Sequence, residues 1–330
     1  MRIAVDAMGG DHAPREVILG AKAGLRFLQE ADSLVLYGPR ECVESECQEI
    51  GLNSTQVAIC DCPEIIEMGE PPIEAIKHKR DSSIVRMVVD AGTREVDAVI
   101  SAGNTGAFAA AAQFKIGPIK GVARPGIAIT LPTFHGPALV CDAGANVAPK
   151  PHHLHQYAKM CSIYARKILH IAEPQVGIIS IGEEAAKGNR LVKEARALIK
   201  SDLSLNFVGN VEGRDIFAGN AHIFICDGFV GNVILKLTEG LAEGIFKTIV
   251  REIEQEDAEL VRSFNPVVER IWRKHDFAEY GGAPLLGINS VAIICHGRSD
   301  HRAISNAIRV ALEGNRANLN GTITDQLAGE

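Results

Sequence analysis

The sequence MRIAVDAMGGDHAPREVILG, residues 1–20, places a short apolar run before a glycine-rich turn and a helix-like segment. The apolar run has the length of a buried strand, so the stretch predicts a strand, a turn and a helix in succession. Two carboxylates and an imidazole, from Asp6, Asp11 and His12, surround the turn. No G-x-G-x-x-G pattern follows the strand, so the dinucleotide fingerprint of such units is absent.

The same alternation of apolar runs and helix-period segments continues along the chain. It predicts a three-layer, Rossmann-like α/β fold in which helices cover a mostly parallel sheet. One pair departs from this rule, because the two apolar runs in residues 126–142, GIAITLPTFHGPALVCD, are joined by a loop too short for a parallel crossover. The expected strands are 2–6, 33–37, 56–60, 97–100, 126–131, 136–141, 175–180, 204–208, 221–226 and 290–294.

Residues 228–280 differ from the rest and predict one or two long helices, interrupted at 265–266. We interpret them as a helix pair that packs on a neighbour or a dimer partner, with a membrane-touching tip as the alternative. The 330 residues suit either two α/β lobes around a cleft or one large domain, and we expect a single domain over 1–330 that includes the pair. The apolar stripe near the interruption consists of Leu260, Val261, Phe264, Val267, Val268, Ile271 and Trp272.

Composition and charge limit the possible partners and the cellular compartment of the protein. The formal charge is −7, from 41 acidic and 34 basic residues without a long basic tract, so nucleic acid is not expected as the main partner. Several of the eight cysteines end apolar runs, where free buried thiols are common, and this favours the reducing cytoplasm. No apolar stretch has the length needed to cross a bilayer.

Polar residues beside glycine follow six of the expected strands. Because the carboxyl ends of strands in an open parallel sheet face one crevice, we expect these segments to converge on a single ligand site. Ordinary turn chemistry explains any one of them alone, since Asp, Asn and Gly are common in turns. The residues concerned are Asp6, Asp11 and His12; Ser101 and Asn104; Asp142 and Asn146; Lys187 and Asn189; Asp227 and Asn232; and His296.

These turns suit an anion. Asn104, Thr105 and Gly106 open a helix whose free amides and dipole favour phosphate, and Lys187 could add a full positive charge. The stretch around Lys187 is not a Walker loop, and no G-x-S-x-G elbow of a serine hydrolase occurs.

Two other chemistries compete with phosphate binding as interpretations of these residues. Cys141, Cys226 and Cys295 stand at strand ends where an acyl-cysteine nucleophile could lie, although a buried structural thiol is the commoner situation. Cys60, Cys62, His152 and His155 match no structural zinc spacing, so no metal is expected.

Six motifs together resemble the phosphate acyltransferase family of bacterial phospholipid synthesis over nearly the whole chain. They are AVDAMGGDHAP (4–14), SAGNTGA (101–107), DAGAN (142–146), AAKGN (185–189), CDGFVGN (226–232) and EYGGAPLLG (279–287). The resemblance implies reversible transfer of a long-chain fatty acyl group from acyl carrier protein to inorganic phosphate. The acyl phosphate formed would serve a membrane glycerol-phosphate acyltransferase.

The resemblance also implies a cytoplasmic homodimer without a cofactor, with a fold similar to phosphotransacetylase and the isocitrate and isopropylmalate dehydrogenases. By the family's motif positions, Lys187 would neutralise phosphate or the developing oxyanion, and Asn232 would donate a hydrogen bond to the thioester carbonyl. The residues lining the site would be Asp6, Gly10, Asp11, His12, Ser101, Gly103, Asn104, Thr105, Asp142, Asn146, Asn189, Asp227 and His296.

The helix pair is more heavily charged than the resemblance implies. Peripheral contact with the inner face of the membrane therefore stays one alternative, and docking of the acidic acyl carrier protein on Arg270, Arg273 and Lys274, or on residues 77–80, is the other. The competing functions are a phosphotransacetylase-like enzyme acting on short acyl-CoA, a catalytically silent sensor of phosphate or acyl carrier protein, and, by fold analogy alone, a nicotinamide dehydrogenase.

Overall fold

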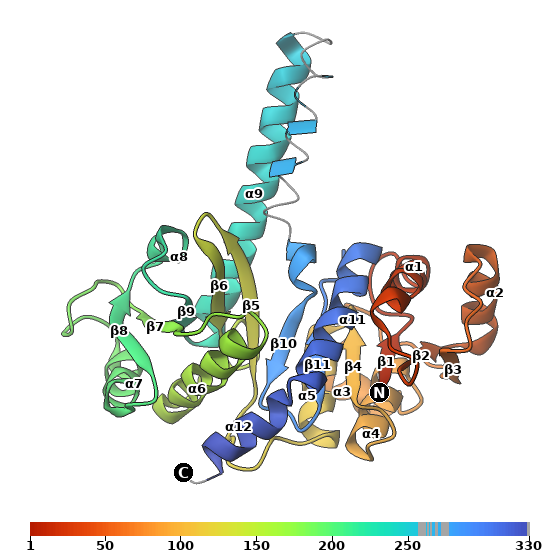
Figure 1. Ribbon diagram of the computed structural model, residues 1–330, viewed down its shortest axis with the longest axis horizontal. Coiled ribbons are helices and arrows are strands. Elements are labelled where there is room, and N and C mark those ends of the chain that lie inside the picture. The colour runs from red at the N-terminus through yellow and green to blue at the C-terminus, as the bar shows by residue number, and fades with distance from the viewer. Residues whose placement is uncertain (257–261, 263, 265, 268–269, 272–276, 329–330) are drawn as a thin grey trace.

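A single sheet of eleven strands runs through the protein, and the order of its strands is β3-β2-β1-β4-β11-β10-β5-β6-β9-β7-β8 (Figure 1). The computed structural model describes residues 1–256, 262, 264, 266–267, 270–271 and 277–328. The strands are β1 (Arg2–Asp6), β2 (Ser33–Gly38), β3 (Val57–Asp61), β4 (Ala98–Ser101), β5 (Gly126–Thr133), β6 (Gly136–Cys141), β7 (Gln175–Ile179), β8 (Asn206–Val211), β9 (Ile223–Ile225), β10 (Ala283–Leu286) and β11 (Val291–Ile294).

Helices cover both faces of the sheet. On one face lie α1 (Arg15–Gly24), α2 (Arg40–Ile50), α6 (Pro151–Lys167), α7 (Arg190–Ser201), α11 (His301–Arg316) and α12 (Leu319–Leu327). On the other lie α3 (Pro72–His78), α4 (Ser83–Gly92), α5 (Thr105–Lys115), α8 (Asp215–Ala218) and the start of α9 (Gly228–Glu256). Two short 3-10 turns, η1 (Leu25–Phe27) and η2 (Phe277–Tyr280), complete the described elements.

Strand periodicity sorts the core into two layers. Ile3 and Val5 of β1 enter one apolar layer and Ala4 between them enters the other, because successive side chains of a strand point to opposite faces. All three are essentially inaccessible to solvent, as expected for a strand with helices on both sides. The three-layer α/β fold predicted from the sequence is therefore confirmed.

The two halves of the sheet run in opposite directions. Strand β5 pairs antiparallel with β6, as predicted, but β10 also pairs antiparallel with both of its neighbours, β11 and β5. Each antiparallel pairing reverses the strand direction, so β6, β9, β7 and β8 run against β1, β2, β3, β4 and β11. The expectation of one antiparallel pair is wrong, because the sequence pattern does not show β10.

All ten expected strands are present, within one to three residues of the expected ends. The missed strand, β10, has four residues and lies in GGAPLLG, where glycines and a proline give no alternating pattern.

Helix α9 is long and projects from the body of the molecule (Figure 1). This confirms the first helix of the expected pair. Most of the second lies outside the described residues, as do the interruption at Asn265 and the stripe positions Leu260, Val261, Val268 and Trp272. Among the described residues, no helix is long and apolar enough to cross a membrane.

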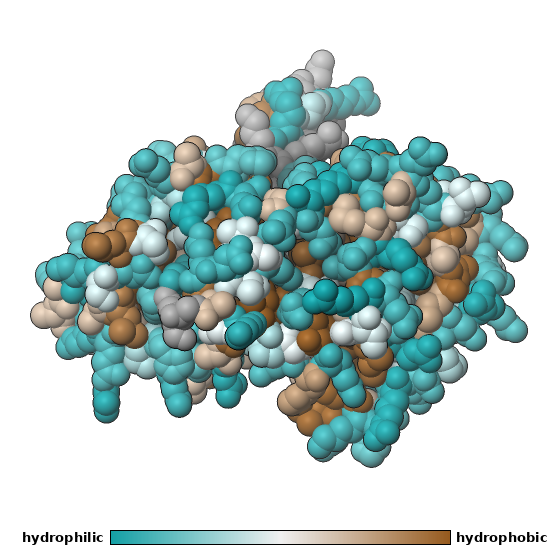
Figure 2. Space-filling view, turned by 60° about the horizontal axis from the view of Figure 1, so that its bottom comes forward, coloured by the Kyte–Doolittle hydropathy of each residue, from teal (hydrophilic) through white to brown (hydrophobic). Residues whose placement is uncertain are grey.

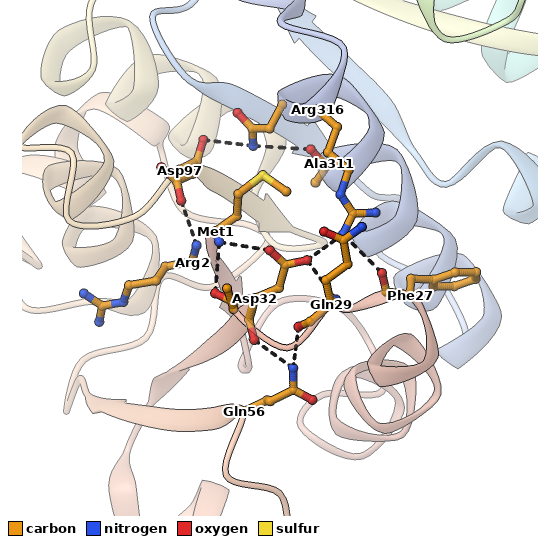
Figure 3. Close-up of polar contacts among 11 residues, drawn as sticks. Met1, Arg2, Phe27, Gln29, Asp32, Gln56, Asp97, Ala311 and Arg316 are labelled. Carbon is orange, nitrogen blue, oxygen red and sulfur yellow. Dashed lines mark hydrogen bonds and ion pairs between the residues drawn. The ribbon is translucent and has the colours of Figure 1, made fainter.

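A polar network fastens the ends of β1 and β2 to the C-terminal part of α11 (Figure 3). The buried carboxylate of Asp32 accepts hydrogen bonds from the α-amino group of Met1 at 2.9 Å and from the Gln29 amide at 2.9 Å, and Arg316 approaches it within 2.5 Å. Burial by itself would raise the pKa of Asp32, but these three donors lower it below the ordinary value. The network therefore favours the ionised carboxylate.

Hydrophilic side chains dominate the face of the molecule seen in Figure 2, where hydrophobic ones form small separate groups. This distribution is usual for a globular protein surface. A longer row of exposed apolar side chains lies on α9.

Candidate active site

The six polar segments follow strands of both halves, so they do not leave the sheet at one common edge. Three follow β1, β4 and β11, and three follow β6, β7 and β9 of the reversed half. The sequence argument that parallel strand ends converge at one edge is therefore wrong in its premise. The C-terminal ends of β11 and β6 still lie close together near the middle of the sheet. Ile294 of β11 pairs with Ala283 of β10, Cys141 of β6 pairs with Ala128 of β5, and β10 and β5 are themselves paired.

A cavity of about 350 Å³ opens at this meeting point. Its wall is mostly apolar and includes Ile127, Ile129, Val147, Phe229 and Ile294. Its polar side chains come from α5, β5, α9, η2 and the loop after β11, and they are Thr105, Thr130, Asn232, Lys236, Glu239, Tyr280 and His296. An apolar wall with a few polar groups is the usual composition of a small-molecule site.

Three of the polar side chains contact one another. The Lys236 ammonium lies 2.9 Å from Oε2 of Glu239 and 3.1 Å from Nε2 of His296, and the other ring nitrogen of His296 accepts the Arg298 amide at 3.1 Å. Burial lowers the pKa of His296, and the charges of Lys236 and Arg298 lower it further, against Glu239 and Asp11. These surroundings favour the neutral imidazole.

Asp6 and Ser101 join the first two polar turns. Asp6 is buried and accepts hydrogen bonds from the Ser101 hydroxyl at 2.6 Å and the Met8 amide at 3.2 Å, while the Gly103 amide donates to the same hydroxyl at 3.0 Å. Burial raises the pKa of Asp6, and these hydrogen bonds oppose the rise. The residues hold two turns together and do not line the cavity.

The first turn also packs on the loop that carries His296. Gly10 has a φ of +110°, and a Cβ there would lie 3.0 Å from the carbonyl oxygen of Gly297, so the backbone conformation and the close approach both favour glycine. The Asp11 amide donates to that carbonyl at 2.7 Å. The side chains of Asp11 and His12 are exposed and outside the cavity lining.

Asn104 and Thr105 have different roles at the start of α5. The buried Asn104 caps the helix by accepting the Ala107 amide at 3.0 Å, and its own amide donates to carbonyl oxygens in the segment 67–70 at 3.0–3.2 Å. With these bonds made, Asn104 is a structural residue. Thr105 is exposed and lines the cavity at the N-terminus of α5.

Asp142 and Asn146 face inward rather than toward a ligand. Asp142 is fully buried and accepts hydrogen bonds from the amides of Ile127, Gly144, Ala145 and Asn146 and from the Asn146 side chain, at 2.6–3.2 Å. Burial raises the pKa of Asp142, and the five donors act in the opposite direction. The turn DAGAN is thus wound around its own carboxylate.

The start of α9 lies against this turn through two glycines. A Cβ at Gly228 would stand 2.7 Å from the carbonyl oxygen of Asn146, and one at Gly231 would overlap that of Asp142. Asp227 caps the helix by accepting the Val230 amide at 2.9 Å. The close approach brings Asn232 to the cavity wall.

Lys187 and Asn189 lie on the exposed loop between β7 and α7. Asn189 caps α7 by accepting the Val192 amide at 2.9 Å. Neither residue is among the described residues that line the cavity. The cavity therefore contains one of the two predicted catalytic residues, Asn232, together with Thr105 and His296 from the predicted lining.

Sequence reasoning missed Lys236, Glu239 and Tyr280 as lining residues. Lys236 and Glu239 follow Asn232 by four and seven residues, the spacing that places side chains on one face of a helix. That spacing could have identified them, but the sequence motif singles out only Asn232 in this part of the chain.

The cysteines do not have the environment of a nucleophile. All eight are free, and Cys141, Cys226 and Cys295 are buried. Burial raises the pKa of Cys295, which borders the cavity, to about 12, and it raises those of Cys141 and Cys226 well above the ordinary value. A thiolate is the reactive form, so these surroundings disfavour an acyl-cysteine step.

No group of three or more His, Cys, Asp or Glu residues in the described part of the chain is arranged to hold a metal ion. His155, one of the weighed metal candidates, instead pairs with Asp202 at 2.8 Å.

The fold is shared with solved phosphotransacetylases and with a 4-hydroxythreonine-4-phosphate dehydrogenase. Similar solved structures include a phosphotransacetylase from Streptococcus pyogenes, with a TM-score of 0.65, 17% identity and coverage of 96% of this chain and 94% of that one. A 4-hydroxythreonine-4-phosphate dehydrogenase from Klebsiella pneumoniae follows, with a TM-score of 0.51, 13% identity and coverage of 95% and 97%. The expected likeness to phosphotransacetylases is therefore confirmed at the level of the fold, and a dehydrogenase shares it, although a different one from the isocitrate and isopropylmalate enzymes that we expected.

Sequence similarity identifies the family of this chain, which the shared fold alone does not. The profile of the family described as "Fatty acid synthesis protein" matches residues 1–321. A phosphate acyltransferase of Desulfitobacterium hafniense is 47% identical over 317 residues, with 95% of this chain and 93% of that protein covered. One of Clostridium novyi is 42% identical over 314 residues, with 94% of each covered. The chain belongs to the phosphate acyltransferase family, and it is an enzyme of the acyltransferase class.

Proposed function

We propose that this enzyme transfers a long-chain fatty acyl group reversibly from acyl carrier protein to inorganic phosphate. The supporting observation is the cavity itself, which joins a mostly apolar wall to a polar cluster from Thr105, Asn232 and Lys236. An acyl chain gains free energy from leaving water for such a wall, and the polar cluster suits a phosphate and a thioester carbonyl.

The chemistry needs positioning more than activation. A phosphate oxygen attacks the carbonyl carbon of the thioester, a C–O bond forms, the C–S bond breaks, and the thiolate leaves with the carrier. Because the thioester is already activated, the enzyme holds the two reactants together and stabilises the oxyanion. Asn232 on the cavity wall is our candidate for donating a hydrogen bond to that oxygen.

Lys187 keeps its proposed role on the strength of the family motif AAKGN. In this role its ammonium neutralises phosphate or the oxyanion from the loop between β7 and α7. We expect Lys187→Ala to lose activity with its fold retained, as judged by circular dichroism. Near-normal turnover of this variant would refute the role.

Two exposed basic regions suit an acidic carrier protein. Lys77, His78 and Arg80 are exposed at the end of α3, whereas Lys79 is paired with Glu70. Arg270 is also exposed, while the other two basic residues suggested for docking, Arg273 and Lys274, lie outside the described residues. Docking through charge predicts that turnover with acyl carrier protein falls as salt rises, so salt-insensitive turnover contradicts it.

Helix α9 supports the proposed homodimer. From Phe229 to Ile249, every fourth residue of α9 is apolar and 40–66% exposed, so these side chains form one stripe along the helix. A second copy of the chain would bury such a stripe as helices pack. We expect Leu237→Glu to shift the mass in light scattering from dimer to monomer, and an unchanged mass argues against this interface. The stripe consists of Phe229, Val233, Leu237, Leu241, Ile245 and Ile249.

We place the enzyme in the cytoplasm, where its acyl phosphate would pass to a membrane glycerol-phosphate acyltransferase. Peripheral contact with the inner face of the membrane fits this handover. Co-sedimentation with phospholipid vesicles tests the contact, and protein left wholly in the supernatant speaks against it.

The decisive assay measures release of free thiol from palmitoyl acyl carrier protein with and without phosphate, and traps the acyl phosphate with hydroxylamine. Phosphate-dependent release with trapped product is the expected result. Release without phosphate would indicate a thioesterase, and no release with phosphate still bound would indicate a sensor.

The second candidate is transfer to phosphate from a short acyl-CoA, which the fold shared with phosphotransacetylases favours. Acetyl-CoA offered beside palmitoyl acyl carrier protein separates the two. Faster turnover of acetyl-CoA would replace the proposal.

A further inference from the structure

We propose that Lys236 is a cation that binds the phosphate substrate in the cavity, oriented there by Glu239. The inference rests on the proposed function and names a residue for it that the sequence motifs did not single out. It is carried by the position of Lys236 on the cavity wall and by its ion pair with Glu239.

Lys236 is the one lysine or arginine among the described residues that line the cavity. His296 does not supply a charge in its neutral form, which its surroundings favour. A phosphate dianion that leaves water for a cavity with a mostly apolar wall needs a charged partner, since an unpaired ion there is strongly disfavoured. Lys236 is therefore placed to meet this requirement.

The contacts of Lys236 orient its ammonium group and leave at least one N–H donor unused. An ammonium has three N–H donors, and Glu239 and His296 engage at most two of them. At least one donor remains for a phosphate oxygen.

The surroundings supply further donors at the same cavity. Thr105 lines it at the first position of α5, an eleven-residue helix whose free amides favour an anion. Asn232 stands one turn before Lys236 on α9, so one helix carries both the proposed phosphate ligand and the proposed donor to the thioester carbonyl. This arrangement would hold the two reactants next to each other.

The test compares Lys236→Met with Lys247→Met. Lys247 lies on the same helix and pairs with Glu243 at 2.6 Å, but it is three turns further from the cavity. We expect Lys236→Met to raise the KM for phosphate by about 10- to 100-fold, the loss typical of a charge-assisted hydrogen bond, and to leave the KM for the acyl carrier substrate unchanged. Lys247→Met should match the wild type in both constants.

A binding measurement keeps the inference separate from the proposed reaction. Inorganic phosphate should raise the Tm of the wild type and of Lys247→Met, and this rise should vanish in Lys236→Met and return in part in Lys236→Arg. A wild-type KM and a wild-type Tm rise in Lys236→Met would overturn the inference. Absence of thiol release in the wild type would instead refute the proposed reaction, and the Tm series would still test Lys236.

Discussion

At the scale of single residues, carboxylates near the strand ends divide into those that build the protein and those that can meet a ligand. The carboxylates of Asp6 and Asp142 accept hydrogen bonds from neighbouring turns, whereas Glu239 lines the cavity from α9. The sequence predicted the loops correctly as places where polar residues gather. It could not show which side chains point inward, because an Asp beside glycine serves a turn and a ligand equally well.

Asp202 offers a measurable pH dependence at this scale. Burial would raise its pKa, but hydrogen bonds from Ser204 and His155 and the charge of Lys159 lower it to about 2, below the ordinary value of 3.8. A depressed pKa contributes stability above the unfolded value, and the contribution disappears as pH falls through the folded value. We expect Asp202→Asn to lower the free energy of unfolding at pH 6 by about 2 kcal/mol.

The check is urea unfolding of wild type and Asp202→Asn at several pH values. Their difference should be constant above pH 5 and shrink between about pH 4 and 2, the window set by the two pKa values. Glu173→Gln, at an exposed position, should follow the wild type throughout. A difference that stays constant down to pH 2 would show that the charge of Asp202 is not what stabilises the fold.

At the scale of elements, prediction succeeded where an apolar run or period was uninterrupted, even in the four-residue strands β4 and β11, and failed where glycine and proline interrupted it. Strand β1 and helix α11 have a clear apolar period, while the four residues of β10 do not. Missing β10 left out two antiparallel pairings in the middle of the sheet, but these two cancel, so the reversal of half of the sheet follows from the predicted β5–β6 pair. For α9 the motif predicts Asn232, whereas Lys236 and Glu239, on the same face of the helix, lie outside the motif and were missed.

Two glycines of α9 allow the effect of close packing on stability to be distinguished from the effect of helix propensity. A methyl group at Gly231 would overlap the carbonyl of Asp142, whereas at Gly240 it would meet nothing within 4 Å. We expect Gly231→Ala to destabilise the protein by about 2–3 kcal/mol, the range of overpacking. Gly240→Ala should stabilise it by up to about 1 kcal/mol, because alanine favours a helix.

Urea unfolding followed by circular dichroism measures both changes. Gly231→Ala should also lose turnover, since Asn232 would be displaced from the cavity wall. Equal stability of Gly231→Ala and Gly240→Ala would contradict the close packing of α9 on the turn 142–146.

At the scale of the whole molecule, the two opposed halves of the sheet share their core. Each apolar layer runs from β1 in one half to β6 and β9 in the other, and β10 bonds to both β11 and β5. The C-terminal segment spans the halves as well, because α11 packs on α1 and α12 on α6. A chain of 330 residues often unfolds in parts, so this sharing has a testable consequence.

We expect the two halves to unfold as one cooperative unit, with buried cysteines as native probes. Cys62 follows β3 in one half and Cys226 follows β9 in the other, and burial raises the pKa of both thiols and shields them from reagents. Pulses of iodoacetamide at increasing urea, read by peptide mass spectrometry, should give one midpoint for both. The exposed Cys42 should react at every urea concentration and calibrates the pulse. Two separate midpoints would mean that β10 joins two independently folding lobes, and the cavity between them would then be expected to open before either lobe unfolds.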